Sequence, residues 1–274
     1  MVNTRTIQRN GIKFRISSEQ HQRFWTKIED GTWEPETFEV FDRFVTSDTT
    51  YLDVGAWEGP TLFYAGQLAR VAYGFEPDPV AFAGLQRNLE ANPEITNTKI
   101  LHQCIAANSG EVRFGSRAGG GDTMSSLLFA AGQTNWTVPS IRLDEFIARE
   151  NLHPPLFVKI DIEGGEYEVL PSLHSFFRRF RPTVYLSTHP GFFGSVGSGL
   201  IRKVRAHCGL VFALRSFKFI YDTRGNRIRL WELLLRAKWR QHVAIVATDR
   251  PWEAESNSGT GSRDRPAAAG LRTE

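Results

Sequence analysis

A glycine-containing loop, Asp53–Gly59, follows an apolar run of the chain. Gly55 permits a tight turn and lets the backbone approach a ligand closely, and Gly59 permits close packing of a helix on a strand. The phosphate-binding fingerprint GxGxxG is absent, because Trp57 and Pro60 stand where its second and third glycines would be. The loop predicts a ligand site without a pyrophosphate cradle, with a plain strand-to-helix turn as the alternative.

An acidic residue, Glu76, ends the next apolar run in the segment GFEPDP, 23 residues after Asp53. In doubly wound folds, a carboxylate at the tip of the second strand accepts both hydroxyls of a ribose. Pro77 could flank an adenine ring. The alternative is that Glu76 is an acid favoured at a helix N-terminus by the helix dipole. Together with the glycine loop, Glu76 predicts a nucleoside site.

Three carboxylates, those of Asp161, Glu163 and Glu166, lie at or just beyond the end of the apolar run 156–162. Clustering this much negative charge is costly without a partner, which a cationic ligand, a metal ion or Lys159 could supply. In the alternative interpretation, Glu163 is solvated and Glu166 caps the following helix. The cluster therefore predicts a second polar centre at the end of this strand.

A histidine, His189, follows the next apolar run in the segment STHPGFFG. From a neighbouring strand end it can reach Asp161, and its ordinary pKa suits proton removal near neutrality. We therefore expect His189 to be a general base. The other histidines have no comparable setting: His21, His102, His153, His174, His207 and His242.

The elements that must position these residues alternate between apolar runs and amphipathic stretches. Continuous apolar runs separated by helices predict a parallel sheet covered on both faces, and right-handed crossovers then give a doubly wound, Rossmann-like α/β fold. Strands are expected at 50–55, 71–76, 99–107, 156–162 and 183–188, and helices at 59–69, 79–92 and 166–177. Residues 108–140 are expected to be irregular, with a short hairpin around the segment EVRFGS.

The flanking segments divide the chain into three parts. Residues 1–46 are expected to form a preamble with a strand at 11–17 and a helix at 35–45. The main domain is expected to span 47–250, ending in a helix, a hairpin at the turn TRGN, a second helix and the strand HVAIVATD. Residues 251–274 contain few large apolar residues and show no periodicity, which predicts a disordered tail.

Composition excludes several classes of protein. The 274 residues are 41% hydrophobic and 23% charged, which excludes a wholly disordered, collagen-like or coiled-coil chain. A net charge of +3 argues neither for nor against nucleic acid, and two cysteines exclude a disulfide scaffold or a multi-cysteine zinc site. Without a long apolar run or a signal-peptide core, we expect no membrane span and a cytoplasmic protein.

The motifs YLDVGAWEG, GFEPDP and VKIDIEGGEYEVL, in this order and spacing, resemble the FkbM family of S-adenosylmethionine-dependent methyltransferases. The resemblance implies a class I sheet of seven strands with an antiparallel last strand, and O-methylation of a hydroxyl on a natural product, sugar or glycolipid. The family loop commonly has Asn-Ile-Gly where this chain has Trp57-Glu58-Gly59. The side-chain contacts of this loop are therefore expected to differ.

The resemblance also implies roles for individual residues. The methionine part of S-adenosyl-L-methionine would contact Asp53, Gly55, Ala56 and Gly59, with Glu76 on the ribose, Pro77 and Cys104 near adenine, and Glu34 closing over the cofactor. Asp161 would lie where the methyl group points, and His189 would be its neighbour. We expect His189 to act as the base and Asp161 to orient it or to bind the substrate hydroxyl. A divalent metal held by Asp161, Glu163 and His189 is the less favoured version.

Three other functions are weighed against this one. A nicotinamide-dependent oxidoreductase is disfavoured by the poor phosphate loop. A nucleic-acid methyltransferase is disfavoured because strand four ends in DIEGG and not in an Asn/Asp-Pro-Pro-aromatic element. A non-catalytic nucleoside-binding protein stays open. The expected partner is a small-molecule or glycan acceptor, with residues 115–137 and 190–200 as its walls.

A basic belt in residues 202–240 adds one further alternative. The belt contains eleven lysines and arginines against Asp222 and Glu232. It predicts either an acidic or phosphorylated acceptor or, slightly favoured, a solvated basic face. The sequence does not indicate an oligomeric state.

Overall fold

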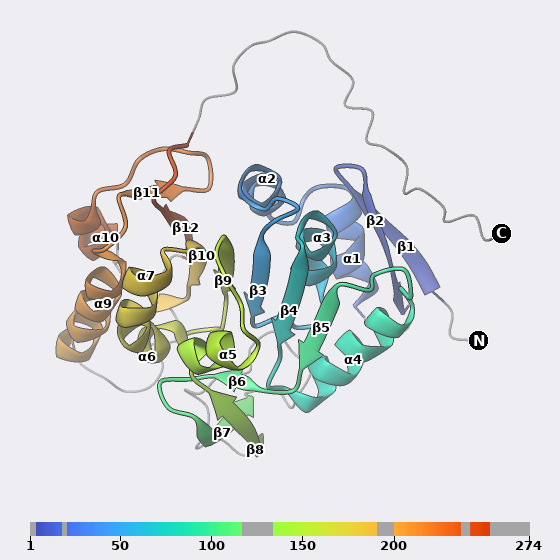
Figure 1. Ribbon diagram of the computed structural model, residues 1–274, viewed down its shortest axis with the longest axis horizontal. Coiled ribbons are helices and arrows are strands. Elements are labelled where there is room, and N and C mark those ends of the chain that lie inside the picture. The colour runs from blue at the N-terminus through green and yellow to red at the C-terminus, as the bar shows by residue number, and fades with distance from the viewer. Residues whose placement is uncertain (1–3, 18–20, 117–133, 191–199, 237–241, 253–274) are drawn as a thin grey trace, which may run out of the picture.

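A seven-stranded sheet with strand order β11-β12-β10-β9-β3-β4-β5 forms the centre of the molecule (Figure 1). The computed structural model describes residues 4–17, 21–116, 134–190, 200–236 and 242–252. The strands of the sheet are β3 Thr50–Val54, β4 Val71–Phe75, β5 Thr98–Leu101, β9 Leu156–Ile160, β10 Thr183–Thr188, β11 Phe219–Asp222 and β12 Val243–Thr248.

The direction of the strands confirms the doubly wound prediction. Strands β5, β4, β3, β9 and β10 run parallel to one another, and β12 runs antiparallel to both β10 and β11. The chain passes from β3 outward through β4 to β5 and then returns to β9 on the other side of β3. The carboxyl ends of β3 and β9 therefore form the switch point at which such sheets bind ligands.

Helices cover both faces of the sheet, as continuous burial of β3 on both faces requires. Tyr51 packs in a cluster with the first four helices and Leu52 in the opposite cluster with the later helices. The first group is α1 Gln22–Glu29, α2 Pro35–Phe44, α3 Pro60–Leu68 and α4 Pro79–Glu90. The second contains α5 Leu143–Arg149, α6 Glu166–Val169, α7 His174–Phe180, α9 Leu200–Leu214 and α10 Leu230–Arg236. No helix among the described residues has the length and apolar character needed to cross a membrane.

The N-terminal segment packs on the sheet. Strands β1 Thr4–Arg9 and β2 Ile12–Ser17 form an antiparallel hairpin whose buried residues join the cluster of α1 to α4. The expected strand at 11–17 and helix at 35–45 are confirmed, whereas β1 and α1 were not expected. At the other end, Trp252 packs against Phe44 and Tyr221. The expected disordered tail at 251–274 therefore begins too early, because Trp252 is packed, and its remainder, residues 253–274, lies outside the described residues.

A second, three-stranded sheet corrects two expectations. The strand expected at 99–107 is divided into β5 and β6, Cys104–Ile105, and β6 belongs to a separate sheet with β7 Gly110–Ser116 and β8 Thr134–Ile141. The prediction of an irregular segment is therefore wrong for the described ends of 108–140, because β7 and β8 pair antiparallel over seven residues. Buried Phe114 and Val138 hold these strands together.

The helix expected at 166–177 is also divided. It consists of α6, a 3₁₀ turn at Leu170–Leu173 and α7. Pro171 lies in the turn and has no N–H to donate, which interrupts a continuous α-helix. The expected hairpin at TRGN is present, because Asp222 N–H donates to the Asn226 carbonyl at 2.9 Å and Ile228 N–H to the Ile220 carbonyl at 2.7 Å, beside the bridge between Tyr221 and Arg227. Strand β11 also pairs with β12, which was not expected. The expected helix before the hairpin is confirmed as α9, which spans Leu200–Leu214.

Candidate active site

A cavity of about 190 Å³ lies where the carboxyl ends of β3, β4, β9 and β10 meet. Its lining includes seven of the residues that the sequence selects: Glu34, Gly55, Ala56, Glu76, Pro77, Asp161 and His189. These residues come from α2 and from four separate strand ends, so the parallel sheet brings together groups up to 155 residues apart. The sequence therefore predicts the location of the cavity and several residues of its wall.

Gly55 lets the first loop pass close to the end of β9. Its φ of 87° lies in the left-handed region, and a Cβ at this position would stand 2.0 Å from the backbone oxygen of Asp161. The backbone N–H groups of Gly55 and Ala56 both donate to the carbonyl of Phe75 at 3.0 Å. Only glycine fits this position, and the close approach gives the loop its course along the cavity.

Glu76 lies at the tip of β4 and holds two backbone groups. Its Oε2 accepts a hydrogen bond from Trp57 N–H at 2.8 Å, and its Oε1 accepts one from Asp78 N–H at 2.8 Å. Burial raises the pKa of Glu76 to about 7, against the lowering effect of these two hydrogen bonds. The carboxyl is therefore fixed in direction at the cavity wall and retains free acceptor capacity for ligand hydroxyls.

Three residues expected at the cofactor do not line this cavity: Asp53, Gly59 and Cys104. Asp53 is fully buried and binds the Tyr51 and Thr61 hydroxyls at 3.0 and 2.7 Å. Gly59 begins α3, where a Cβ would stand 2.3 Å from the Phe63 ring, so its role here is packing. Asp53 and Gly59 therefore support the first loop from the protein interior.

Cys104 lies in a small adjoining cavity of about 20 Å³. This cavity shares Gly55, Pro77, Phe114 and Ile162 with the main one, so Cys104 lies beside the site without lining its main space. Burial raises the pKa of the Cys104 thiol to about 12, which keeps the thiol neutral.

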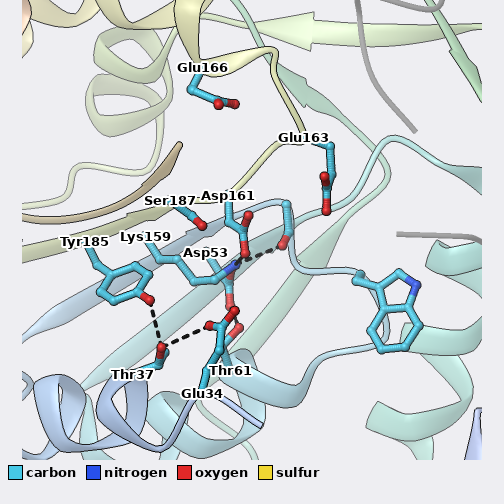
Figure 2. Close-up of polar contacts among 12 residues, drawn as sticks. Glu34, Thr37, Asp53, Thr61, Lys159, Asp161, Glu163, Glu166, Tyr185 and Ser187 are labelled. Atoms are coloured by element: carbon cyan, nitrogen blue, oxygen red, sulfur yellow. Dashed lines mark hydrogen bonds and ion pairs between the residues drawn. The ribbon is translucent and has the colours of Figure 1, made fainter. Parts of the chain in front are cut away.

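Lys159 connects the two strands at the switch point (Figure 2). Its buried ammonium donates to Asp53 Oδ1 at 3.0 Å and to the Gly55 carbonyl at 3.1 Å, and it stands 3.6 Å from Asp161 Oδ2. Burial alone lowers the pKa of Lys159, but Asp53 and Asp161 outweigh burial and raise the pKa above its ordinary value. Lys159 is therefore a permanent cation that partners both carboxylates.

His189 faces carboxylates with both ring nitrogens. Nε2 lies 3.6 Å from Asp161 Oδ1 and 3.6 Å from Glu163 Oε2, and Nδ1 lies 3.6 Å from Glu166 Oε1. Burial lowers the pKa of His189, but these carboxylates outweigh it and raise the pKa to about 9. At neutral pH the imidazole is protonated, so it has no lone pair with which to act as the expected base.

Asp161, Glu163 and Glu166 occupy different environments. Burial raises the pKa of Asp161, but Lys159 and His189 outweigh it and give a lowered pKa, so Asp161 is ionised. Burial raises the pKa of Glu163 to about 7. Glu166 is fully buried and accepts hydrogen bonds from the N–H groups of Gly164 and His189. It fixes the loop after β9, and the interpretation as a simple helix cap is wrong.

Asp161, Glu163 and His189 are also close enough to hold a metal ion. One ligand atom from each residue lies within 4.8 Å of the others. Two carboxylates and an imidazole are a donor set that divalent metals accept. The same three side chains therefore permit two arrangements. In one, they hold a divalent metal ion, and in the other, a protonated His189 pairs with the two carboxylates.

Two parts of the cavity were not expected from the sequence. One is His242, for which the sequence predicts no role; its ring centre lies 4.8 Å from that of His189. Burial and the charge of His189 lower the pKa of His242. The antiparallel register of β12 against β10 puts Val243 opposite Thr188, and so brings His242 to the same strand end. Phe114 reaches the cavity from the small sheet, where the Trp136 indole donates to the Pro77 carbonyl at 2.8 Å.

Trp57, which stands where the family commonly has asparagine, packs its side chain against the N-terminal segment. Its ring packs against Phe24 with ring centres 4.7 Å apart and stacks on Trp25 at 6.2 Å. Trp57 has a φ of 47°, and its N–H is one of the two donors to Glu76. The segment before residue 47 therefore stabilises the first loop.

The described part of the basic belt lies mainly outside the cavity. Arg215 stacks on Phe212 at 4.2 Å and Arg227 on Phe219 at 5.3 Å, both as exposed side chains. This arrangement is typical of a solvated basic face. Most of the expected acceptor walls, residues 117–133 and 191–199, lie outside the described residues.

Solved structures show distant similarity to the chain. The methyltransferase FkbM of Methylobacillus flagellatus is 16% identical, with a TM-score of 0.38, over 61% of this chain and 42% of that one. A TehB-like SAM-dependent methyltransferase of Corynebacterium glutamicum is 10% identical, with a TM-score of 0.42, over 83% and 95% of the two chains.

Sequence comparison gives the closer evidence. The hexuronic acid methyltransferase AglP of Haloferax volcanii is 26% identical over 168 residues, which are 60% of this chain and 66% of that protein. The chain thus spans slightly less than two thirds of this relative. Residues 53–221 match the methyltransferase FkbM domain. Because this match covers more than half of the chain and includes the cavity's strand ends, the chain belongs to the FkbM methyltransferase family.

Proposed function

We propose that the protein is an S-adenosylmethionine-dependent O-methyltransferase that acts on a hydroxyl of a sugar, glycolipid or secondary metabolite. The observation that carries the proposal is the cavity at the β3–β9 switch point. There, the Gly55 loop, Glu76 and the cluster of Asp161, Glu163 and His189 line one cavity. The relative named as a hexuronic acid methyltransferase supports a sugar as the acceptor.

The residues present fit this cofactor. Gly55 lets the first loop lie directly against the Asp161 backbone, and Gly55, Ala56 and Trp57 line the cavity, so a ligand can lie along this loop. Glu76 has acceptor capacity for two ribose hydroxyls, and Pro77 lies beside it for the adenine. Four carboxyl groups line the cavity, those of Glu34, Glu76, Asp161 and Glu163, against the charges of Lys159 and His189. This excess of acids suits a ligand with a sulfonium and an ammonium group.

In the proposed mechanism the cofactor supplies an electrophilic methyl group, and the protein orients the acceptor. Asp161 is ionised and held between Lys159 and His189, so its free acceptor capacity can bind an acceptor hydroxyl. The cationic His189 keeps Asp161 and Glu163 in place, which replaces the base role expected from the sequence. Holding the reacting groups in one geometry supplies much of the rate enhancement of such transfers.

The first test is cofactor binding followed by methyl transfer. We expect S-adenosylhomocysteine to bind in isothermal titration calorimetry, and Glu76→Ala to weaken it about 10- to 100-fold, because charged hydrogen bonds contribute roughly 1.5–3 kcal/mol. Glu39→Ala, on the exposed side of α2, is the matched control and should bind normally.

Three outcomes would contradict this proposal. Absence of binding by the wild type would refute the assigned cofactor, and NADH binding in its place would favour the oxidoreductase. Binding without transfer of a radiolabelled methyl group to any hydroxylated acceptor in a broad screen would favour a non-catalytic nucleoside-binding protein.

A further inference from the structure

A second cavity, of about 320 Å³, adjoins the first. Glu34 and His242 line both cavities, so these two side chains form the boundary between them. The second cavity lies between the start of α2, the middle of β10 and the turn after β11, with Ala244 of β12 in its wall. None of the residues that would hold the adenosine, Gly55, Glu76 or Pro77, belongs to it. It therefore provides a separate space next to the reacting end of the cofactor cavity.

The lining of this cavity is rich in hydrogen-bonding groups. It contains the carboxylates of Glu34, Glu36 and Asp222 and the hydroxyls of Thr37 and Thr223, together with Tyr185 and Arg224. The only aliphatic side chain among the described lining residues is Ala244. Such a wall offers many hydrogen-bonding partners to a ring with several hydroxyls.

The charged groups of the wall are already arranged. Arg224 Nη2 lies 3.1 Å from Glu36 Oε1, and Asp222 accepts hydrogen bonds from the backbone N–H groups of Arg224 and Asn226. Glu34 is different, because its carboxylate faces Asp161 at the boundary and accepts a hydrogen bond from the Thr37 hydroxyl. Glu34 is thus the acid placed to meet a ligand that extends from one cavity into the other.

A chain of hydrogen bonds holds Glu34 in this position (Figure 2). The Thr37 hydroxyl donates to Glu34 Oε2 at 3.1 Å and lies 2.7 Å from the Tyr185 hydroxyl. Since Thr37 has one proton and gives it to Glu34, Tyr185 must donate to Thr37. Burial keeps the pKa of Tyr185 well above its ordinary value, so it remains a donor. Glu34 also has a φ of 38°, a backbone strain of the kind that is stored at functional sites.

We propose that the second cavity is the acceptor site, that it binds a polyhydroxylated ring, and that Glu34 accepts the proton of the hydroxyl that is methylated. Asp161 binds a neighbouring hydroxyl of the same ring. The acceptor oxygen gains the methyl carbon as the sulfur–carbon bond breaks, and its proton passes to the Glu34 carboxylate. This inference rests on the proposed function and assigns its substrate class and base. The raised pKa of Glu34, caused by burial and by Asp161, is consistent with proton uptake.

The first experiment measures binding of a simple polyol. Saturation-transfer NMR with methyl glucoside, in the presence of saturating S-adenosylhomocysteine, should show contact with the wild type. Ala244→Phe fills the cavity and should abolish the signal while S-adenosylhomocysteine still binds by calorimetry, which shows that the variant is folded. A signal unchanged in Ala244→Phe, no signal with the wild type, or binding of catechol in its place would overturn the assignment of the cavity.

The second experiment tests Glu34 with whichever hydroxylated acceptor turns over. Glu34→Gln should lower kcat about 10²–10⁴-fold, as expected for loss of a general base, while S-adenosylhomocysteine still binds and saturates the variant. Tyr185→Phe and Thr37→Val release Glu34 without removing it, so they should raise KM for the acceptor more than they lower kcat. Glu39→Gln, the same change on the exposed side of α2, should behave like the wild type.

The outcomes separate the two proposals. If the wild type binds no S-adenosylhomocysteine and transfers no methyl group, the proposed function fails. If the wild type transfers methyl groups and Glu34→Gln does so at the same rate, the cofactor assignment stands and the role of Glu34 is wrong.

Discussion

At the scale of single residues, His189 shows how neighbours change a role that residue type suggests. A histidine at a strand end is a reasonable base when it is considered alone, because its ordinary pKa is close to neutral. Here Asp161, Glu163 and Glu166 surround the ring within 3.6 Å and keep it protonated. The sequence places all four groups at adjacent strand ends, but it cannot show which oxygen atoms face the ring.

The pH dependence of the rate distinguishes a cationic from a basic His189. With a pKa of about 9, a protonated His189 that supports Asp161 should give a rate that falls as pH rises through 9. A neutral, basic His189 would instead give a rate that rises through the same range. We expect the fall in kcat, measured from pH 7 to 10, and its absence in His189→Asn, whose side chain does not titrate. A rise toward pH 10 in the wild type would restore the base role.

Single residues were predictable where their position along a strand was sufficient. Glu76, Pro77 and Asp161 follow directly from the ends of apolar runs, and the structure places all three at the cavity. Asp53 instead lies within β3, one residue before its end, and its partners Tyr51 and Thr61 hold its carboxylate in the interior. Such a difference depends on side-chain packing from α3, which no local pattern contains.

At the scale of elements, the close approach of the β3 loop to the end of β9 sets the shape of the cofactor cavity. The left-handed Gly55 allows the loop to reach the Asp161 backbone, and Lys159 then binds both segments. This contact joins two elements that are more than 100 residues apart. Any side chain at position 55 must move one of them.

Gly55→Ala should therefore lose both stability and cofactor affinity. The strained φ costs roughly 1–3 kcal/mol, and the clash with Asp161 adds to this. Gly11→Ala is a matched control, because Gly11 has a similar φ of 82° and nothing within 4 Å of the new Cβ. Urea unfolding should show the greater loss for Gly55→Ala, and calorimetry should show weaker S-adenosylhomocysteine binding in that variant alone. Equal effects of the two substitutions would mean that the close approach is unimportant.

Element prediction succeeded for the buried parallel strands and failed for the small sheet. Strands β3, β4, β9 and β10 are continuous apolar runs, which local patterns show well. Strands β7 and β8 are paired across residues 117–133, so their hydrogen bonds join parts of the chain that no short window includes. The register that brings His242 beside His189 has the same origin.

At the scale of the whole molecule, charge balance decides whether a metal ion is needed. Lys159 and the protonated His189 already face Asp161 and Glu163. We therefore expect methyl transfer to survive dialysis against EDTA. If activity disappears after dialysis and returns with Mg²⁺ or Mn²⁺, with an unchanged circular dichroism spectrum throughout, the three-residue cluster holds a metal.

The two cavities draw on different stretches of the polypeptide. Of the residues that line the second cavity, only Tyr185 falls within the family match at 53–221, and the others precede or follow it. Under our proposal, most side chains that contact the acceptor, together with the proposed base Glu34, are thus encoded at the flanks of the match, whereas the cofactor residues lie within it. Substitutions at flank positions other than Glu34 can then diversify the acceptor in evolution while the cofactor site is left unchanged.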